Sequence, residues 1–201
     1  MAKSDEICMG HKPTQPQQST LGSPEGLLFS DITENSAKVI WLAPKIRVNK
    51  FVINYVPATG GASNTVEVEG SRTQTTLVNL MPGVEYRVSL VSVKGTEEST
   101  PASGSLTTAL DSPSGLRAIN VTDSEALAVW KPSLASVDNY VISYSAKNAP
   151  AVEYTVSGNN VENDIIGLQP STEYILKMYA VRGPHRSREI SAIFTTGIVE
   201  L

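Results

Sequence analysis

The stretch Leu80–Val88, "LMPGVEYRV", decides the fold, because a near copy, Leu168–Leu176 "LQPSTEYIL", follows 88 positions later. Both read Leu-x-Pro-x-x-Glu-Tyr, and in both an alternation of apolar and polar residues follows. Proline locks φ and so fixes the direction of the chain. A tyrosine that starts a strand after such a crossing is typical of the tyrosine corner of Greek-key sandwiches. We therefore expect Tyr86 and Tyr174 to be buried, with each hydroxyl bonded to the backbone several residues upstream.

The two stretches belong to a longer internal repeat. When Trp41 is set on Trp130, an offset of 89, Ser23–Leu27 "SPEGL" meets Ser112–Leu116 "SPSGL". A period near 90 residues is too long for a solenoid unit and suits a whole small domain. We expect the following division: a disordered N-terminal tail at 1–20, a first domain at 21–109, a second domain at 111–197 and a C-terminal tail at 198–201.

Each copy contains short runs in which apolar and polar residues alternate, separated by turn-forming residues. A period of two indicates strands with one buried face, and several short strands in 90 residues indicate an antiparallel β-sandwich. The expected inward-facing residues include Trp41 and Trp130, which with Tyr86 and Tyr174 we assign to the structural core. No helical period extends over more than two turns, so the predicted class is all-β.

These features together resemble the fibronectin type III domain: an early tryptophan, a late tyrosine corner, no disulfide and about 90 residues, present twice. The stretches "DITENSAKVIW", "GVEYRVSLVSVKG" and "NVTDSEALAVW" are similar to type III repeats of the tenascins. The resemblance implies two tandem Greek-key, immunoglobulin-like β-sandwiches arranged end to end. It also implies a piece of a large, oligomeric, secreted matrix glycoprotein that modulates cell adhesion.

An alternative parent is a cell-surface receptor ectodomain of the receptor tyrosine phosphatase type, which also uses type III domains. A cytokine receptor is disfavoured, because the second copy lacks extra cysteines and a Trp-Ser-x-Trp-Ser stretch. The resemblance implies cell-surface or matrix proteins as partners. It also implies that any oligomerisation takes place through parts of the parent protein outside this chain.

The composition of the chain also bears on its ligands, its disulfides and its cellular location. The chain of 201 residues has a net charge of −4 and 18% charged residues, which disfavours a general nucleic-acid binder. The single cysteine, Cys8, excludes an intrachain disulfide. The start "MAKSDEICMG" lacks the apolar core of a signal peptide, and no apolar run is long enough to insert in a membrane. We expect a cytosolic protein or, as the resemblance favours, a fragment of a secreted one.

No catalytic, cofactor or metal motif is present. The chain lacks HExxH, CxxC, GxxxxGK[ST] and GxSxG patterns, and its two histidines are His11 in the tail and His185 in a predicted loop tip. Cys8 and His11 both lie in the tail, with two residues between them. No scaffold is expected there to orient them as a catalytic pair. We predict no enzyme, no cofactor and no metal.

Two surface features remain as candidate sites. The second F–G segment, "RGPHRSR", gathers four candidate ligands of a sulfated glycosaminoglycan: Arg182, His185, Arg186 and Arg188. The alternative is a solvated loop whose arginines serve solubility. Neither F–G segment has Asp after its Gly, so the Arg-Gly-Asp integrin ligand of some family members does not transfer. Asn120 begins the only N-x-[ST] sequon and is a candidate glycan acceptor, the alternative being an unmodified residue at a strand end.

The segment between the two copies is short. Only "LDS", Leu110–Ser112, separates the last expected strand of the first copy from the first of the second. Three residues span at most about 10 Å, so we expect the sandwiches to sit end to end with restricted tilt. A flexible tether would require a longer Gly/Ser-rich segment.

Overall fold

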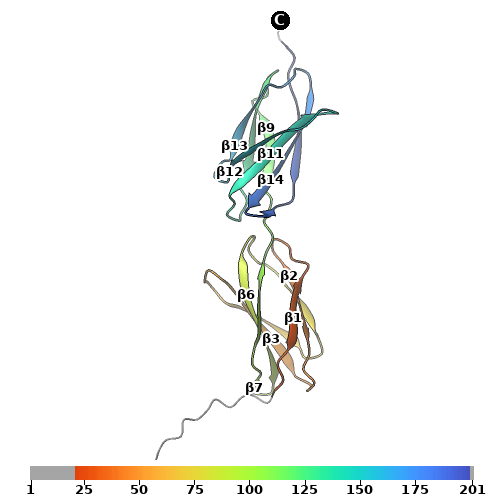
Figure 1. The fold of residues 1–201 in the computed structure, drawn as a ribbon, viewed down its shortest axis with the longest axis vertical. Coiled ribbons are helices and arrows are strands. Elements are labelled where there is room, and N and C mark those ends of the chain that lie inside the picture. The colour runs from red at the N-terminus through yellow and green to blue at the C-terminus, as the bar shows by residue number, and fades with distance from the viewer. Residues whose placement is uncertain (1–20, 200–201) are drawn as a thin grey trace, which may run out of the picture.

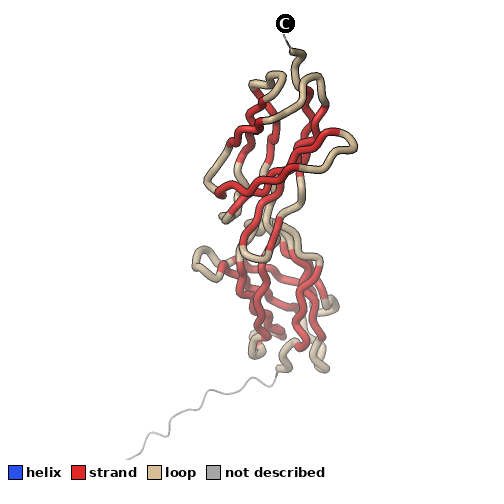
Figure 2. Tube along the Cα trace, turned by 45° about the horizontal axis from the view of Figure 1, so that its top comes forward, coloured by secondary structure: helices blue, strands red, loops and turns tan. Residues whose placement is uncertain are grey.

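The computed structural model describes residues 21–199, which form two β-sandwiches end to end in a rod (Figure 1). All regular elements of the described residues are strands, and no helix occurs among them (Figure 2). The all-β class and the tandem type III architecture predicted from the sequence are confirmed. The predictions for the tail, including those for Cys8 and His11, lie outside the described residues.

The first sandwich packs one sheet of order β1-β2-β5 on a second of order β4-β3-β6-β7, with β8 also on β6. Its strands are β1 (Glu25–Ser30), β2 (Ala37–Leu42), β3 (Lys50–Pro57), β4 (Asn64–Glu69), β5 (Gln74–Leu77), β6 (Glu85–Lys94), β7 (Glu97–Glu98) and β8 (Ala102–Thr107).

The second sandwich repeats this topology with sheets of order β9-β10-β13 and β12-β11-β14-β15, with β16 on β14. Its strands are β9 (Ser114–Ile119), β10 (Glu125–Lys131), β11 (Asn139–Ala146), β12 (Val152–Ser157), β13 (Glu162–Ile166), β14 (Glu173–Arg182), β15 (His185–Arg186) and β16 (Ile190–Thr195). All pairings are antiparallel, as expected where consecutive strands are joined by short turns.

Each sandwich has its own hydrophobic core, built from the inward faces of its two sheets. The indoles of Trp41 and Trp130 are 1% and 4% exposed. Each packs edge-on against an aromatic ring of the facing sheet: Phe51 at 5.2 Å and Tyr140 at 5.8 Å between ring centroids. Such edge-to-face pairs contribute beyond the area they bury. The two cores are therefore separate and equivalent.

The crossing between the two sheets is held by a tyrosine and a threonine in each copy. The Tyr86 hydroxyl accepts the Met81 N–H at 2.9 Å, and the Tyr174 hydroxyl accepts the Gln169 N–H at the same distance. The Thr108 hydroxyl accepts the Val84 N–H at 2.9 Å and donates to the Met81 carbonyl at 2.6 Å. These bonds satisfy backbone groups that the buried turn would otherwise leave without partners.

The last strand of each sandwich is interrupted, which the alternation pattern does not predict. The strand splits into β7 and β8 in the first copy, and a buried serine hydroxyl takes the place of ladder bonds at the break. The Ser99 hydroxyl accepts the Ser92 N–H, and the Ser187 hydroxyl accepts the Ala180 N–H, both at 2.9 Å. Each sandwich thus has seven strands when the two parts of its last strand are counted as one.

A pair of tyrosines in the second sandwich, the buried Tyr144 and the half-buried Tyr154, makes a testable prediction about pH. Burial, and secondarily a hydrogen bond with Tyr154 at 3.1 Å, raises the pKa of Tyr144 from 10.0 to about 12. Because the folded state holds the proton more tightly, this contribution to stability is complete below pH 10 and is lost as the pH rises from 10 to about 12. In Tyr154→Phe we expect the pKa of Tyr144 to fall, as measured by its Cζ chemical shift in carbon-13-labelled protein. An unchanged pKa would contradict any contribution of Tyr154 and leave burial and Tyr174 as the causes.

Candidate binding site at the joint between the sandwiches

The segment that joins the sandwiches is anchored rather than loose. Leu110 is buried, and the Asp111 carboxylate accepts the backbone N–H groups of Leu134 and Ala135 at 2.6 and 2.9 Å. A carboxylate that accepts two N–H groups makes strong, charge-assisted bonds. The linker is therefore tied to the loop that follows β10 in the second sandwich.

One side chain of the second sandwich also bonds directly to the first. The Arg182 guanidinium donates through Nη2 to the Gly83 carbonyl at 2.6 Å and through Nη1 to the Ser136 carbonyl at 3.3 Å. Gly83 lies in the turn between β5 and β6 of the first sandwich. The arginine thus spans the joint and limits the relative tilt of the two sandwiches.

The close approach at the joint requires a glycine. A Cβ on Gly83 would lie 3.0 Å from both the Ala135 Cβ and Arg182 Nη2. The positive φ of 63° is not the reason, because Ser171, the corresponding residue of the second copy, adopts a φ of 49° with a side chain. A side chain at residue 83 would therefore press on the neighbouring sandwich, and Ala135 and Arg182 would have to shift to make room for it.

The four cationic candidates lie on and after a tight hairpin, not on the loop that the sequence predicts. Arg182 pairs with His185 across a two-residue turn, so His185 and Arg186 form β15 rather than a loop tip. Gly183 supplies the positive φ, 53°, that the first position of such a turn requires, and proline fits the next. The turn is braced because the Gly183 N–H donates to the Asp138 carboxylate at 2.8 Å.

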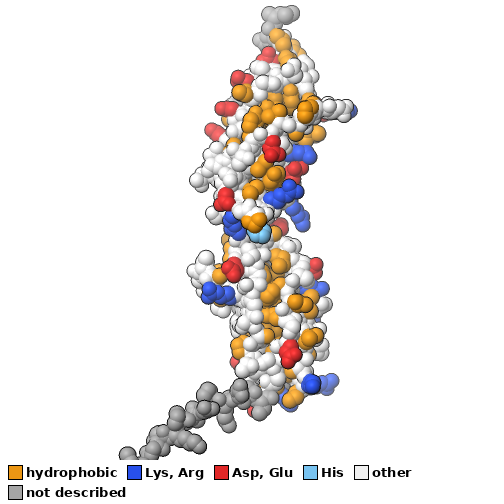
Figure 3. Space-filling model, in the orientation of Figure 1, with side chains coloured by type: hydrophobic (Ala, Val, Ile, Leu, Met, Phe, Trp, Pro, Cys, Tyr) orange, Lys and Arg blue, Asp and Glu red, His pale blue; other side chains and the backbone are white. Residues whose placement is uncertain are grey.

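Three of the four candidates come together in one cleft. A hollow of about 250 Å³ is lined by Arg182, His185 and Arg186 from the second sandwich. Its opposite wall comes from the first sandwich and the linker, and the remaining lining residues are Ile32, Thr107, Thr108, Ala109 and Leu110. In Figure 3 the one described histidine lies at the waist of the rod, with Lys and Arg side chains nearby in that view. Arg188 is exposed and does not line the cleft.

The arginines of the hairpin are held but not neutralised by direct pairing. Within residues 21–199, the three ion pairs at or below 4.0 Å involve lysines, among them Lys177 with Glu189 at 3.1 Å. The Arg186 guanidinium stacks over the Tyr179 ring at 5.2 Å, a distance typical of a cation–π contact. The nearby carboxylates of Asp111 and Asp138 accept backbone N–H groups. The guanidinium groups therefore remain available to an external anion.

The glycan candidate lies at the other end of the first strand of the second sandwich. Asn120 directly follows β9, is exposed and has a φ of 51°, a conformation that asparagine tolerates. The hydroxyl of Thr122 in the same sequon accepts the Glu125 N–H at 2.9 Å and so closes the next turn. A shallow hollow of about 290 Å³ beside Asn120 is walled by Leu127 and Ile166.

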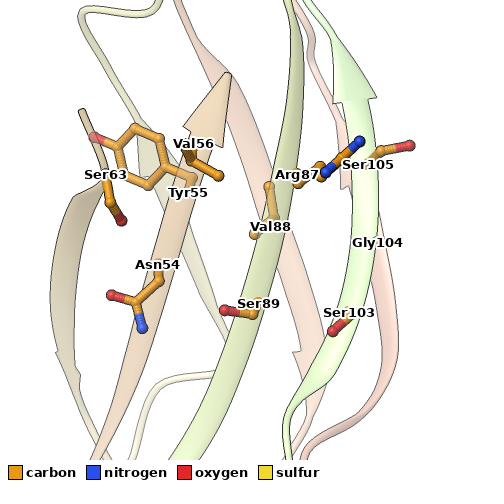
Figure 4. A pocket seen from close by; sticks show the side chains of 10 residues that line it. All are labelled: Asn54, Tyr55, Val56, Ser63, Arg87, Val88, Ser89, Ser103, Gly104 and Ser105. Atoms are coloured by element: carbon orange, nitrogen blue, oxygen red, sulfur yellow. The ribbon is translucent and has the colours of Figure 1, made fainter. Parts of the chain in front are cut away.

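Another hollow lies on the outer face of β3, β6 and β8 in the first sandwich (Figure 4). It has a volume of about 600 Å³ and is lined mainly by small polar side chains such as Asn54, Ser89 and Ser103. Arg87 is the only formally charged side chain in its lining, so it lacks the acid–base pair or activated nucleophile of a catalytic site.

Other site types are also unsupported in the part of the chain that the structure describes. No three His, Cys, Asp or Glu side chains group closely enough there to hold a metal ion. Over the same residues, no helix has the length and apolar character needed to cross a bilayer.

Several residues of the joint were not identified from the sequence, namely Gly83, Asp111, Ala135 and Ser136. A signal for two of them exists in the repeat itself. Asp111 replaces Gly22 of the first copy, and Gly83 is replaced by Ser171 in the second. At these two positions the residue that takes part in the joint in one copy is thus replaced in the other.

Comparison with known proteins identifies relatives for both sandwiches. The family model of the fibronectin type III domain matches residues 22–105 and 111–193. The chain is 56% identical to chicken (Gallus gallus) tenascin and 55% identical to mouse (Mus musculus) tenascin, over 90% of its length in each case. It spans about a tenth of these relatives, 10% and 8% of their lengths. A solved two-domain fibronectin type III segment of chicken tenascin matches with a TM-score of 0.68 and 30% identity, covering 87% of this chain and 100% of that one.

Proposed function

Because this chain belongs to the fibronectin type III family, we propose that it is a non-catalytic adhesion module of a secreted, tenascin-like extracellular matrix glycoprotein. Domains at 21–109 and 111–197 space and present surfaces to cell-surface or matrix partners. The observation that carries this proposal is the joint. Arg182 and Asp111 tie the linker and both sandwiches into one rod, as a spacer element requires. The tenascin relatives support the matrix origin over a receptor ectodomain.

We propose further that the basic hairpin binds sulfated glycosaminoglycan through Arg182, His185, Arg186 and Arg188. Arginine forks suit sulfate and carboxylate groups because they donate two parallel N–H bonds. The absence of ion pairs for these arginines among residues 21–199 supports the proposal. Since the chain as a whole is acidic, the electrostatic attraction of a sulfated polyanion is confined to this cluster of arginines. This attraction weakens as the salt concentration rises.

Elution from a heparin column tests this binding. We expect the Arg186→Ala/Arg188→Ala double variant to elute at clearly lower salt than the wild type, because two contacts with the polyanion are lost. The matched control is Arg87→Ala/Arg117→Ala, which removes two exposed arginines of β6 and β9 that lie outside the hairpin and do not line the cleft. It should elute close to the wild type. Elution of the double variant at the wild-type salt concentration would contradict the proposed site.

We also propose that Asn120 carries an N-glycan when the chain is secreted. Its exposure at the end of β9 leaves room for a sugar on the folded surface. Protein from a eukaryotic secretory host should show an added mass that peptide N-glycosidase removes. The Asn120→Gln variant should lack that mass. Wild-type protein at its unmodified mass would reject the proposal.

A further inference from the structure

We propose that the cleft between the sandwiches binds one anionic group of a sulfated sugar chain, and that the bound group fixes the relative orientation of the sandwiches. This inference rests on the proposed glycosaminoglycan binding and adds to it the position of the site and a mechanical consequence. It distinguishes Arg182, His185 and Arg186, which line the cleft, from Arg188, which does not.

The composition of the walls couples binding to orientation. Ile32 and Thr107 belong to the first sandwich, whereas Arg182, His185 and Arg186 belong to the second. A ligand in the cleft therefore touches both sandwiches. Any change in their relative tilt alters the distance between the walls and weakens the contacts, so a bound ligand favours the orientation in which the cleft fits it.

Arg182 is prepared to bind an anion without leaving the joint. A guanidinium has five N–H donors, and the bonds to the Gly83 and Ser136 carbonyls use two of them. The remaining donors can bind an anion at the cleft while the bond to the Gly83 carbonyl keeps the sandwiches together. Because the carbonyls already hold the planar group in place, little side-chain entropy is lost when the anion binds.

Arg186 and His185 complete a cationic wall. The Arg186 guanidinium lies over the Tyr179 ring, a contact that uses none of its N–H groups as hydrogen-bond donors to a carboxylate and leaves them for a ligand. His185 is exposed and can add a ring N–H donor. The carboxylates of Asp111 in the linker and of Asp138 beside the hairpin turn accept backbone N–H groups, and neither lines the cleft.

The size and lining of the cleft limit the ligand. A volume of about 250 Å³ is below the roughly 300–1,000 Å³ of pockets for drug-sized molecules. It suits one sulfate or carboxylate with part of its sugar ring, and the rest of the chain would run over the adjoining surface. Ile32 and Leu110 offer apolar contacts to the ring. A free sulfate ion would use the arginines but not these apolar contacts.

The test uses the full chain with a heparin-derived tetrasaccharide and, separately, inorganic sulfate. Calorimetry measures the affinity, and residual dipolar couplings measure the relative orientation of the sandwiches. Ile32→Asp places a negative charge on the wall from the first sandwich, at a residue already 39% exposed. The matched control is Leu28→Asp, the same change at a residue 63% exposed in β1, which does not line the cleft.

We expect Ile32→Asp to weaken tetrasaccharide binding by about five- to tenfold, because an acidic group then faces the anion across a few ångströms. Leu28→Asp should change it by less than about twofold, since salt screens charges beyond roughly 8 Å. The tetrasaccharide should also narrow the spread of orientations in the wild type.

The outcomes separate this inference from the proposal on which it rests. Absence of tetrasaccharide binding to the wild type would contradict the proposed glycosaminoglycan binding itself. Binding that both aspartate variants weaken equally, with unchanged dipolar couplings, would overturn the cleft site and leave binding by the hairpin standing. Orientation fixed equally well by inorganic sulfate would show a general anion site and would overturn the assignment to a sugar chain.

Discussion

Trp41→Ala is expected to lower the free energy of unfolding of the first sandwich by about 3–5 kcal/mol, the cost typical of truncating a buried tryptophan or phenylalanine. The indole is almost fully buried and packs edge-on against Phe51, so its removal leaves a large cavity between the two sheets. Urea unfolding followed by backbone amide signals of each sandwich measures the change. The second sandwich should unfold at nearly the wild-type urea concentration, because its core is separate.

A second substitution distinguishes volume from hydrogen bonding as the role of this tryptophan. The buried Nε1 atoms of Trp41 and Trp130 have no hydrogen-bond partner within the described residues. The indole N–H therefore contributes no bond that phenylalanine would lose, and its burial without a partner is itself a cost. We expect Trp41→Phe to be much milder than Trp41→Ala. Equal losses for the two variants would contradict volume as the role of the indole, and a matching loss in the second sandwich would contradict two independent cores.

The features of the fold that followed from the sequence are those that each copy satisfies within itself. Alternation places Trp41 and Trp130 in the interior, since a strand with one buried face has a period of two. The Leu-x-Pro-x-x-Glu-Tyr stretch predicts the crossing, because a buried tyrosine hydroxyl needs a nearby backbone partner. Both the buried tryptophans and the crossing could be predicted because the signal for each lies within a short stretch of sequence. Both signals also occur in the two copies.

The features that escaped prediction are marked neither by residue type nor by the alternation of apolar and polar residues. The break in the last strand rests on a serine hydroxyl, and serine is equally common in exposed turns. The position of the candidate site on the molecule was also not predicted from the sequence. The cluster of arginines is visible in the sequence, but its placement against the first sandwich depends on Gly83, 99 residues before Arg182. Nothing local marks that glycine apart from its replacement by Ser171 in the other copy.

Gly83→Asn is expected to open the joint while leaving the first sandwich folded. Asparagine tolerates positive φ, so the backbone conformation at 63° is preserved. Its Cβ, however, would lie 3.0 Å from Ala135 and Arg182, and the rest of the side chain needs more room still. The turn must withdraw from the second sandwich, and the bond from Arg182 to the Gly83 carbonyl is lost. A hydrogen bond from a charged donor contributes about 1.5–3 kcal/mol, enough to change the favoured orientation of the sandwiches.

Gly95→Asn is the matched control for this opening. It introduces the same residue in the same sandwich at a similar φ of 61°, where no atom lies within 4 Å of the new Cβ. Both variants should unfold at similar urea concentrations, whereas residual dipolar couplings should report a changed relative orientation only in Gly83→Asn. If Gly83→Asn kept the wild-type orientation, the arginine bridge would not determine the geometry of the joint. If both variants changed orientation alike, the effect would belong to the substitution itself and not to the contact between the sandwiches. A change confined to Gly83→Asn would instead mean that a single carbonyl, made accessible by the absence of a side chain, sets the angle at which the rod presents its surfaces.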